Sequence, residues 1–341
     1  MGWFNPLNIE KHMFDLSKKK AVVVILSGIV LAGLIYFIYE LRPVYGISKT
    51  EFKIAQGMGI REIAANLYSQ NLIHSKTAFE IYGILTAKSR SLKPGEYILN
   101  GSISASDLIK IFSGGPEEIS VIIRPGMTLK EIDNLLYSDG IIPENGLENY
   151  NLTNLKTEFS FLENNNLEGF LFPDTYKFFP ASDPGDILKK LLKNFQQKAY
   201  PDLSQSKNPY QTLILASILE KEIIDPNEQK IAAGILEKRL KINMPLQVDS
   251  SVIYAVCRGK YSNCPPLSSS DYQTNSPFNT YKFKGLPPAP ISNPGLQAII
   301  AAANPQKSDY LYYLSDPKTK KTIFSRTLEE QNKNRVNYLN L

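Results

Sequence analysis

Apolar residues follow two patterns along the chain, and each predicts a different kind of element. Residues 21–39 (AVVVILSGIVLAGLIYFIY) form an uncharged, mainly apolar run. A helix of about nineteen residues crosses a bilayer core of roughly 30 Å, so this run predicts one membrane-spanning helix. Beyond it, short runs of strand-forming residues alternate with stretches of helical periodicity. That mixture predicts an α+β fold outside the membrane.

A strand–turn–helix segment occurs twice after the apolar run. GMGIREI (57–63) continuing to LYS (67–69) returns as GMTLKEI (126–132) continuing to LYS (136–138). Each copy has a β-like run, a glycine turn and then a helix with apolar residues at i, i+3 and i+7. These stripes are Ile60, Ile63 and Leu67, and Leu129, Ile132 and Leu136. The pattern resembles LysM-like carbohydrate-binding modules, so we expect an α+β subdomain over residues 50–150. A scaffold without a ligand is the alternative.

Residues 151–341 predict a second, mixed α+β domain. Helical periodicity marks several segments, and two further segments are strand-like. The predicted helices lie at about 185–200, 209–224, 227–241, 250–256 and 294–303 and from 327 onward, and the predicted strands at 310–314 and 322–324. Residues 275–294 are rich in Pro, Asn and Gly, and a loop of that length in a compact domain usually serves a function.

Charge predicts the orientation of the apolar helix. Lys18, Lys19 and Lys20 directly precede it, whereas Glu40 and Arg42 follow it and nearly cancel. The positive-inside rule then leaves residues 1–20 as a cytoplasmic tail and everything beyond residue 40 outside the cell membrane. The run is longer than a usual signal-peptide core and no small-residue cleavage site follows, which favours a retained anchor in the bilayer over a cleaved signal. A net charge of +5, dispersed along the chain, does not indicate nucleic-acid binding.

The cysteine and histidine content restricts the available chemistry. Cys257 and Cys264 lie in the predicted extracytoplasmic part, where they form either one disulfide or two unpaired thiols. Without a nearby histidine they do not supply four zinc ligands. The chain has two histidines, His12 and His74, and His12 is predicted to be cytoplasmic. No metal or other cofactor is therefore expected, and an enzyme built from this chain must rely on carboxylates and amides.

The segment LILASILEKE (213–222) places glutamates at the end of an apolar helix. Glu222 shares a face with Leu215, Ile218 and Leu219, while Glu220 faces the smaller side chains of Ala216 and Ser217. Burial and the negative end of the helix dipole both raise the pKa of Glu222, as a general acid near neutral pH requires. A frayed helix end with both glutamates in water is the alternative. The intervening Lys221 is expected to reach Asp225 at i+4.

Four segments in order resemble the endolytic murein transglycosylases, the YceG-like family. They are LEGFLFPDTY (167–176), ILASILEKE (214–222), RLKINMPLQVDSSVIYAV (239–256) and SPFNTYKFKGLPPAPISNPG (276–295). The resemblance implies an inner-membrane protein whose outer domain cuts the MurNAc–GlcNAc linkage inside peptidoglycan strands and leaves 1,6-anhydroMurNAc ends. One glutamate acts as acid and then as base, without a cofactor. Peptidoglycan is the implied partner, and membrane-bound peptidoglycan synthases are further candidates.

The resemblance also implies site residues. The catalytic glutamate falls within Glu220-Lys221-Glu222, and we expect Glu222, with Glu220 as the alternative. The expected substrate-binding residues are Gln247, Asp249, Asn279 and Tyr281, followed by Glu168, Asp174 and Tyr176. Asp249 could instead cap the helix that follows it. Family histidines near the C-terminus are replaced here by Thr322 and Glu330-Gln331-Asn332. Two other functions stay open: a non-enzymatic peptidoglycan tether or adaptor, and a hydrolytic muramidase with Asp249 as its second carboxylate.

Overall fold

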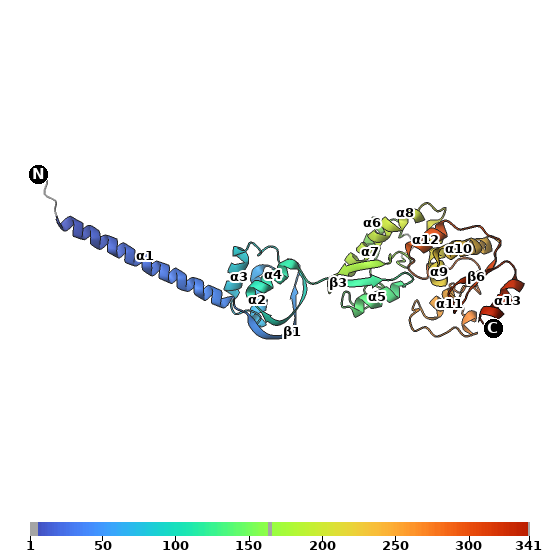
Figure 1. The fold of residues 1–341 in the computed structure, drawn as a ribbon, viewed down its shortest axis with the longest axis horizontal. Helices are drawn as coiled ribbons and strands as arrows, with labels where there is room; N and C mark the ends of the chain where they lie inside the picture. The colour runs from blue at the N-terminus through green and yellow to red at the C-terminus, as the bar shows by residue number, and fades with distance from the viewer. Residues whose placement is uncertain (1–5, 163–165, 340–341) are drawn as a thin grey trace. The chain divides into compact units, whose positions relative to one another are not determined.

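The computed structural model describes residues 6–162 and 166–339, and it has the mixed α+β character that the sequence predicts (Figure 1). The chain divides into two compact units, Met1–Glu117 and Glu118–Leu341. The boundary expected at residue 150 lies inside the second unit, because strand β3 (Ile119–Ile123) pairs with β4 (Asp174–Phe178). The two copies of the repeat therefore belong to different units.

The first unit begins with helix α1, which runs from Pro6 to Glu40. Its segment Val22–Glu40 is long and apolar enough to cross a membrane, and no other helix in the described ranges passes that test. The side chains from Val22 to Ala32 are exposed, as expected of a helix whose partner is lipid.

The rest of the first unit is a strand–helix–helix–strand–helix arrangement. Its elements are β1 (Val44–Ile54), α2 (Ile60–Ser69), α3 (Lys76–Leu85), β2 (Gly95–Ile103) and α4 (Ala105–Gly114). The strands are antiparallel, with Phe52 opposite Tyr97. Ile63 and Leu67, from the predicted stripe of α2, are completely buried in a core that they share with Phe52 and with residues of α3 and α4. The helical period read from the sequence therefore identified the core face correctly.

The second unit is mainly helical. Its remaining elements are α5 (Leu129–Ser138), α6 (Thr153–Glu158), α7 (Pro184–Lys198), α8 (Tyr200–Leu203), α9 (Pro209–Glu222), α10 (Pro226–Lys241), α11 (Asp249–Val256), η1 (Asp271–Gln273), α12 (Leu296–Ala303), β5 (Tyr312–Ser315), β6 (Thr322–Ser325) and α13 (Leu328–Leu339). Helix α9 packs against α12, α10, α11 and α8, and Figure 1 shows α9, α10 and α12 close together. The predicted helices and strands are observed with shifts of a few residues at their ends. Strand β4 was not predicted.

Candidate active site

The candidate site lies at the C-terminal end of helix α9. Every residue from Leu213 to Leu219 is buried, so the helix is held on all sides by the core. Asn208 caps its start through a hydrogen bond from the Gln211 N–H to Oδ1 (3.2 Å). Ile223 has extended backbone angles, and Pro226 follows three residues later. The helix therefore ends at Glu222, and its last carbonyls and carboxylate lie at the edge of the core.

Glu222 opens into a cleft of about 690 Å³ within the second unit. Three further residues expected from the sequence line the same cleft: Gln247, Asp249 and Tyr281. The Ser250 N–H donates to Glu222 Oε1 at 3.3 Å, and the Tyr281 hydroxyl donates to Asp249 Oδ1 at 2.5 Å. The two carboxylates thus lie in one cavity, and each is oriented by its own donor.

The surroundings of Glu222 favour its protonated form. Burial raises the pKa of this carboxyl, hydrogen bonding to Ser250 acts in the opposite direction, and the charge of Asp249 raises it further. A carboxyl with a raised pKa holds its proton more firmly than an exposed glutamate, and in a cleft that a ligand can enter it is placed to donate that proton.

A buried network holds the loop that carries Gln247 and Asp249. The Val248 N–H donates to Thr280 Oγ1 (2.9 Å), and the Gln247 N–H donates to the Thr280 carbonyl (3.2 Å). Gln247 itself has a φ of +50°, an uncommon value for a residue other than glycine. Asp249 begins α11, but its carboxylate bonds Tyr281 and the N-cap is Val248. The alternative of Asp249 as a helix cap therefore does not hold.

Asn279 organises the loop of the cleft from inside. It is completely buried, and its Nδ2 donates to the carbonyls of Tyr272 and Thr274 at 2.9 Å each. Its Oδ1 accepts the Tyr281 N–H (3.1 Å). All the hydrogen bonds of this amide are therefore made within its own loop, where it supports Tyr281. Asn279 does not line the cleft, whereas the sequence led us to expect a contact with the ligand.

Glu220 points away from the cleft. Its Oε2 accepts the N–H of Gly295 at 2.9 Å, at the start of α12. Burial raises the pKa of this carboxyl too, but the partner that it contacts is backbone. Two glutamates from one helical turn therefore have different surroundings: Glu222 faces a cavity and Glu220 fastens α12 to α9.

Lys221 does not pair with Asp225, so that expectation was wrong. Its Nζ donates to the Gly126 carbonyl (3.2 Å) and lies 3.6 Å from the centre of the Tyr261 ring. Asp225 instead caps α10 by accepting the N–H groups of Asn227 and Glu228. Because Asp225 precedes Pro226, it leaves the helical conformation, and its side chain turns to the helix that follows.

A disulfide between Cys257 and Cys264 closes the loop that contains Tyr261. The Tyr261 hydroxyl donates to the carbonyl of Ser250 (3.0 Å), the same residue whose N–H contacts Glu222. The loop is fixed from its other side by Glu131, whose Oε1 accepts the N–H groups of Tyr261 and Ser262 at 2.9 Å. This loop therefore links Ser250, the neighbour of Glu222, to Glu131 of α5 through hydrogen bonds.

Asp174 and Tyr176 lie on β4, outside the residues that line the cleft. Asn194 of α7 donates to both of them, and Lys198 forms an ion pair with Asp174. The Tyr176 hydroxyl donates to the Phe172 carbonyl (2.6 Å). Both side chains thus fasten β4 to α7.

Glu168 is a buried carboxyl with three hydrogen-bond donors. Its Oε1 accepts from the Leu129 N–H (2.9 Å) and the Asn293 amide (3.0 Å), and its Oε2 accepts from the Tyr254 hydroxyl (3.0 Å). Burial nevertheless raises its pKa to about 8. Glu168 also does not line the cleft.

Glu168→Gln is expected to change how stability depends on pH. In the folded state Glu168 keeps its proton up to about pH 8, whereas in the unfolded state it releases that proton above its ordinary pKa of 4.5. Wild-type stability therefore falls as pH rises from about 4.5 through about 8. Glutamine removes this loss, and the variant should exceed wild type at pH 9 by a few kcal/mol, since one pKa unit corresponds to about 1.4 kcal/mol. Urea unfolding between pH 4 and 9 measures this. Glu148→Gln, an exposed neighbour, is the control, and parallel curves for all three proteins would contradict the prediction.

The cleft also contains residues that the sequence did not single out as ligands. They are Arg239, Tyr272, Tyr312, Tyr313, Gln331, Asn332 and Arg335. Tyr272 packs edge-on against Tyr281 with ring centres 4.7 Å apart, and Arg239 donates to the carbonyls of Leu246 and Leu311 (2.7 Å each). These residues come from η1, α10, β5 and α13, which are far apart in the sequence. Their positions along the chain therefore do not indicate that they line one cleft. No group of three His, Cys, Asp or Glu side chains within the described ranges is arranged to hold a metal ion.

Comparisons with known proteins cover nearly the whole chain. The sequence profile of the YceG-like family matches residues 52–337. An endolytic murein transglycosylase of Bacillus subtilis is 31% identical over 324 residues, which is 88% of each chain. A protein of the same name from Streptococcus pneumoniae is 28% identical over 347 residues, covering 90% of this chain and 62% of that protein.

A solved structure shares both the sequence and the fold. It is a putative yceG-like protein from Listeria monocytogenes, 30% identical, with a TM-score of 0.54. The match covers 84% of this chain and 99% of the other.

Proposed function

The chain belongs to the YceG-like family, and from that premise we propose that it is a membrane-anchored endolytic transglycosylase of peptidoglycan. The observation that carries the proposal is Glu222, the end residue of α9, facing a cleft with its pKa raised by burial. The relatives named endolytic murein transglycosylases supply the substrate class.

In the proposed reaction Glu222 acts twice. Its carboxyl proton passes to the glycosidic oxygen between MurNAc and GlcNAc as the bond from that oxygen to C1 breaks. The C6 hydroxyl of the same MurNAc attacks C1, and its proton returns to the Glu222 carboxylate. The products are a GlcNAc hydroxyl and a 1,6-anhydroMurNAc end, and no water is consumed. Because the nucleophile is part of the substrate, a second catalytic carboxylate is not required.

The other cleft residues are proposed to hold the sugar. Gln247 and the tyrosines offer amide and hydroxyl groups and aromatic faces to a glycan strand. Asp249, fixed by Tyr281, keeps a negative charge near Glu222 and so favours the protonated form of that carboxyl. Asp249 also supports one rival function: a hydrolytic muramidase, in which this second carboxylate would activate water.

The proposal extends to the first unit. The apolar segment Val22–Glu40 would anchor the enzyme in the cytoplasmic membrane, with residues 1–20 inside and everything beyond residue 40 outside. The strand–helix–helix–strand order of residues 44–103 is compatible with a LysM-like module that binds glycan. A tether that binds peptidoglycan without cutting it is the second rival.

Product analysis tests the proposal. Purified full-length protein is incubated with isolated glycan strands, and the new ends are identified by mass spectrometry. We expect internal cuts with anhydro ends, each lighter by one water than a reducing end. Reducing ends would overturn the proposal in favour of a muramidase, and binding without new ends would favour a tether.

The pH profile of cleavage gives an independent readout of the proposed acid. Glu222 donates its proton in the first step, and burial raises its pKa. Activity should therefore persist above the ordinary range of a glutamate and fall as pH rises through the raised value. Asp249→Asn removes the nearby negative charge and should move this fall to lower pH. Initial rates between pH 4 and 9 measure both profiles, and coinciding profiles would argue against the role given to Asp249.

A further inference from the structure

We infer that the cavity between α5 and the disulfide loop is a subsite for the acidic peptides that peptidoglycan strands carry. This inference rests on the proposed function and adds a contact outside the catalytic cleft. The cavity has a volume of about 890 Å³ and lies wholly within the second unit. None of its lining residues lines the cleft of Glu222.

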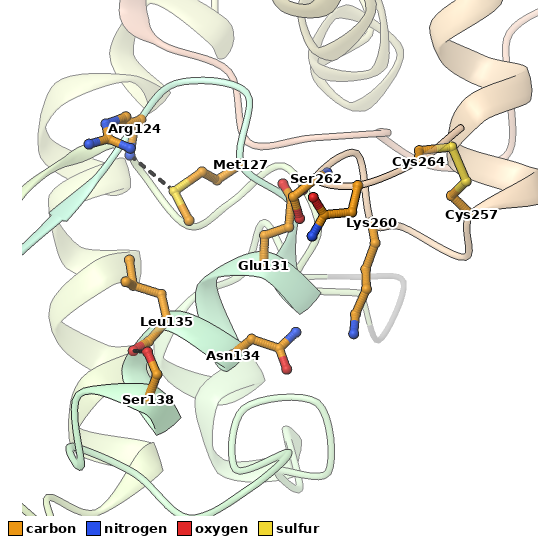
Figure 2. A pocket seen from close by; sticks show the side chains of 11 residues that line it. Arg124, Met127, Glu131, Asn134, Leu135, Ser138, Cys257, Lys260, Ser262 and Cys264 are labelled. Atoms are coloured by element: carbon orange, nitrogen blue, oxygen red, sulfur yellow. Dashed lines mark hydrogen bonds between the residues drawn. A yellow bond between two sulfur atoms is a disulfide. The ribbon is translucent and has the colours of Figure 1, made fainter. Parts of the chain in front are cut away.

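The charge of this cavity suits an anionic ligand. Arg124 and Lys260 line it, both are exposed, and neither side chain has a hydrogen-bond or ion-pair partner among the described residues. Figure 2 shows Arg124 at the upper left and Lys260 near the centre of the view. Glu131, the acidic residue of the lining, already accepts N–H groups from Thr128, Tyr261 and Ser262. Its carboxylate oxygens are thus occupied by backbone N–H groups, while the side chains of Arg124 and Lys260 stay available.

The rest of the lining suits a peptide. Met127 and Leu135 supply an apolar surface, and Asn134, Ser138, Ser262 and Asn263 supply amides and hydroxyls. Figure 2 shows Leu135, Asn134 and Ser138 along α5 and Ser262 and Lys260 on the facing loop. A short peptide with free carboxylates and methyl side chains matches this combination of cations, polar donors and apolar surface.

The cavity lies one layer of residues from the catalytic helix end. Lys221, next to Glu222, contacts both walls: its Nζ bonds the Gly126 carbonyl beside Met127 and lies over the ring of Tyr261 beside Lys260. The Cys257–Cys264 disulfide lines the cavity and closes the loop that carries Lys260. A peptide of about four residues spans roughly 14 Å when extended, which is enough to cross one such layer. A strand in the cleft could therefore place a peptide here.

Two substrates separate this inference from the proposed function. Glycan strands with intact peptides are compared with the same strands after an amidase has removed the peptides. Arg124→Gln combined with Lys260→Gln should lower kcat/KM about tenfold on the peptide-bearing strands, because two partly screened charge contacts are lost. On bare strands the same protein should match wild type within about twofold.

The matched control removes two charges elsewhere. Lys193 and Lys307 are exposed in the second unit and line neither cavity, so Lys193→Gln with Lys307→Gln should leave both rates unchanged. Direct binding of the isolated stem peptide, followed by NMR on Glu222→Gln protein, should weaken by a similar factor in the Arg124 and Lys260 variant. Equal loss on both substrates, or no loss on either, would overturn the inference. Absence of cleavage by wild type would instead refute the proposed function.

Discussion

Glu222→Gln is expected to abolish measurable glycan cleavage without disturbing the fold. Glutamine keeps the oxygen that accepts the Ser250 N–H, but it has no acidic proton for the leaving oxygen. Loss of a general acid lowers rates by about 10² to 10⁴. Thermal unfolding should occur at the wild-type temperature or above it, since the amide is neutral at every pH and therefore never places a charge in this buried position. Release of anhydro ends and calorimetry measure the two effects.

Glu220→Gln is the matched control for this experiment. The substitution is chemically identical and lies on the same helical turn, in a carboxyl whose pKa burial also raises. Its partner is the Gly295 N–H and not the cleft, so cleavage should stay within about threefold of wild type. Loss of activity in Glu220→Gln with retention in Glu222→Gln would reverse the assignment of the acid.

The parts of the fold that the sequence predicted are those with a strong local period. The stripes of α2 and α5 identified buried faces, because burial repeats with the turn of the helix, and the mostly apolar segment Leu213–Leu219 identified the buried part of α9. Strand β4 was missed because its alternation covers only the five residues DTYKF, and its pairing with β3 joins residues more than fifty positions apart. The unit boundary was displaced for the same reason: the repeat resembled one domain, while strand pairing assigns its second copy to the other.

In the candidate site, too, the sequence identified some residues correctly and misjudged others. The resemblance and helix geometry together pointed to Glu222, and the loop segments supplied Gln247, Asp249 and Tyr281. Polar residues of the same segments, such as Asn279 and Glu168, proved to be internal supports. Sequence alone does not separate a polar residue that faces a ligand from one that satisfies buried backbone, because both sit in irregular loops rich in the same residue types. To tell these two kinds of polar residue apart, one must know the hydrogen-bond partner of each polar atom in the folded structure.

Asn293 is the strongest example of such a support, and Asn293→Ala should have the largest effect on stability. Its side chain is completely buried and makes four hydrogen bonds. Oδ1 accepts from Gly169 (2.9 Å) and Leu171 (2.8 Å), and Nδ2 donates to the Met127 carbonyl and to Glu168 (3.0 Å each). Alanine leaves the N–H groups of Gly169 and Leu171 unpaired in the core, and each unpaired group costs about 1 to 3 kcal/mol. The Met127 carbonyl and Glu168 Oε1 each keep a backbone donor but lose the amide.

We therefore expect Asn293→Ala to destabilise the second unit by on the order of 4 kcal/mol, which lowers its unfolding temperature by roughly 10 °C for a domain of this size. Asn304→Ala, an exposed asparagine at the end of α12, should change stability by less than about 0.5 kcal/mol. Asn293→Asp tests the charge of the network, because it keeps the acceptor for Gly169 and Leu171 but faces Glu168 with a second carboxylate. That variant should recover stability as pH falls and the introduced carboxylate gains a proton. Equal stability of all three variants across pH would contradict the role given to Asn293.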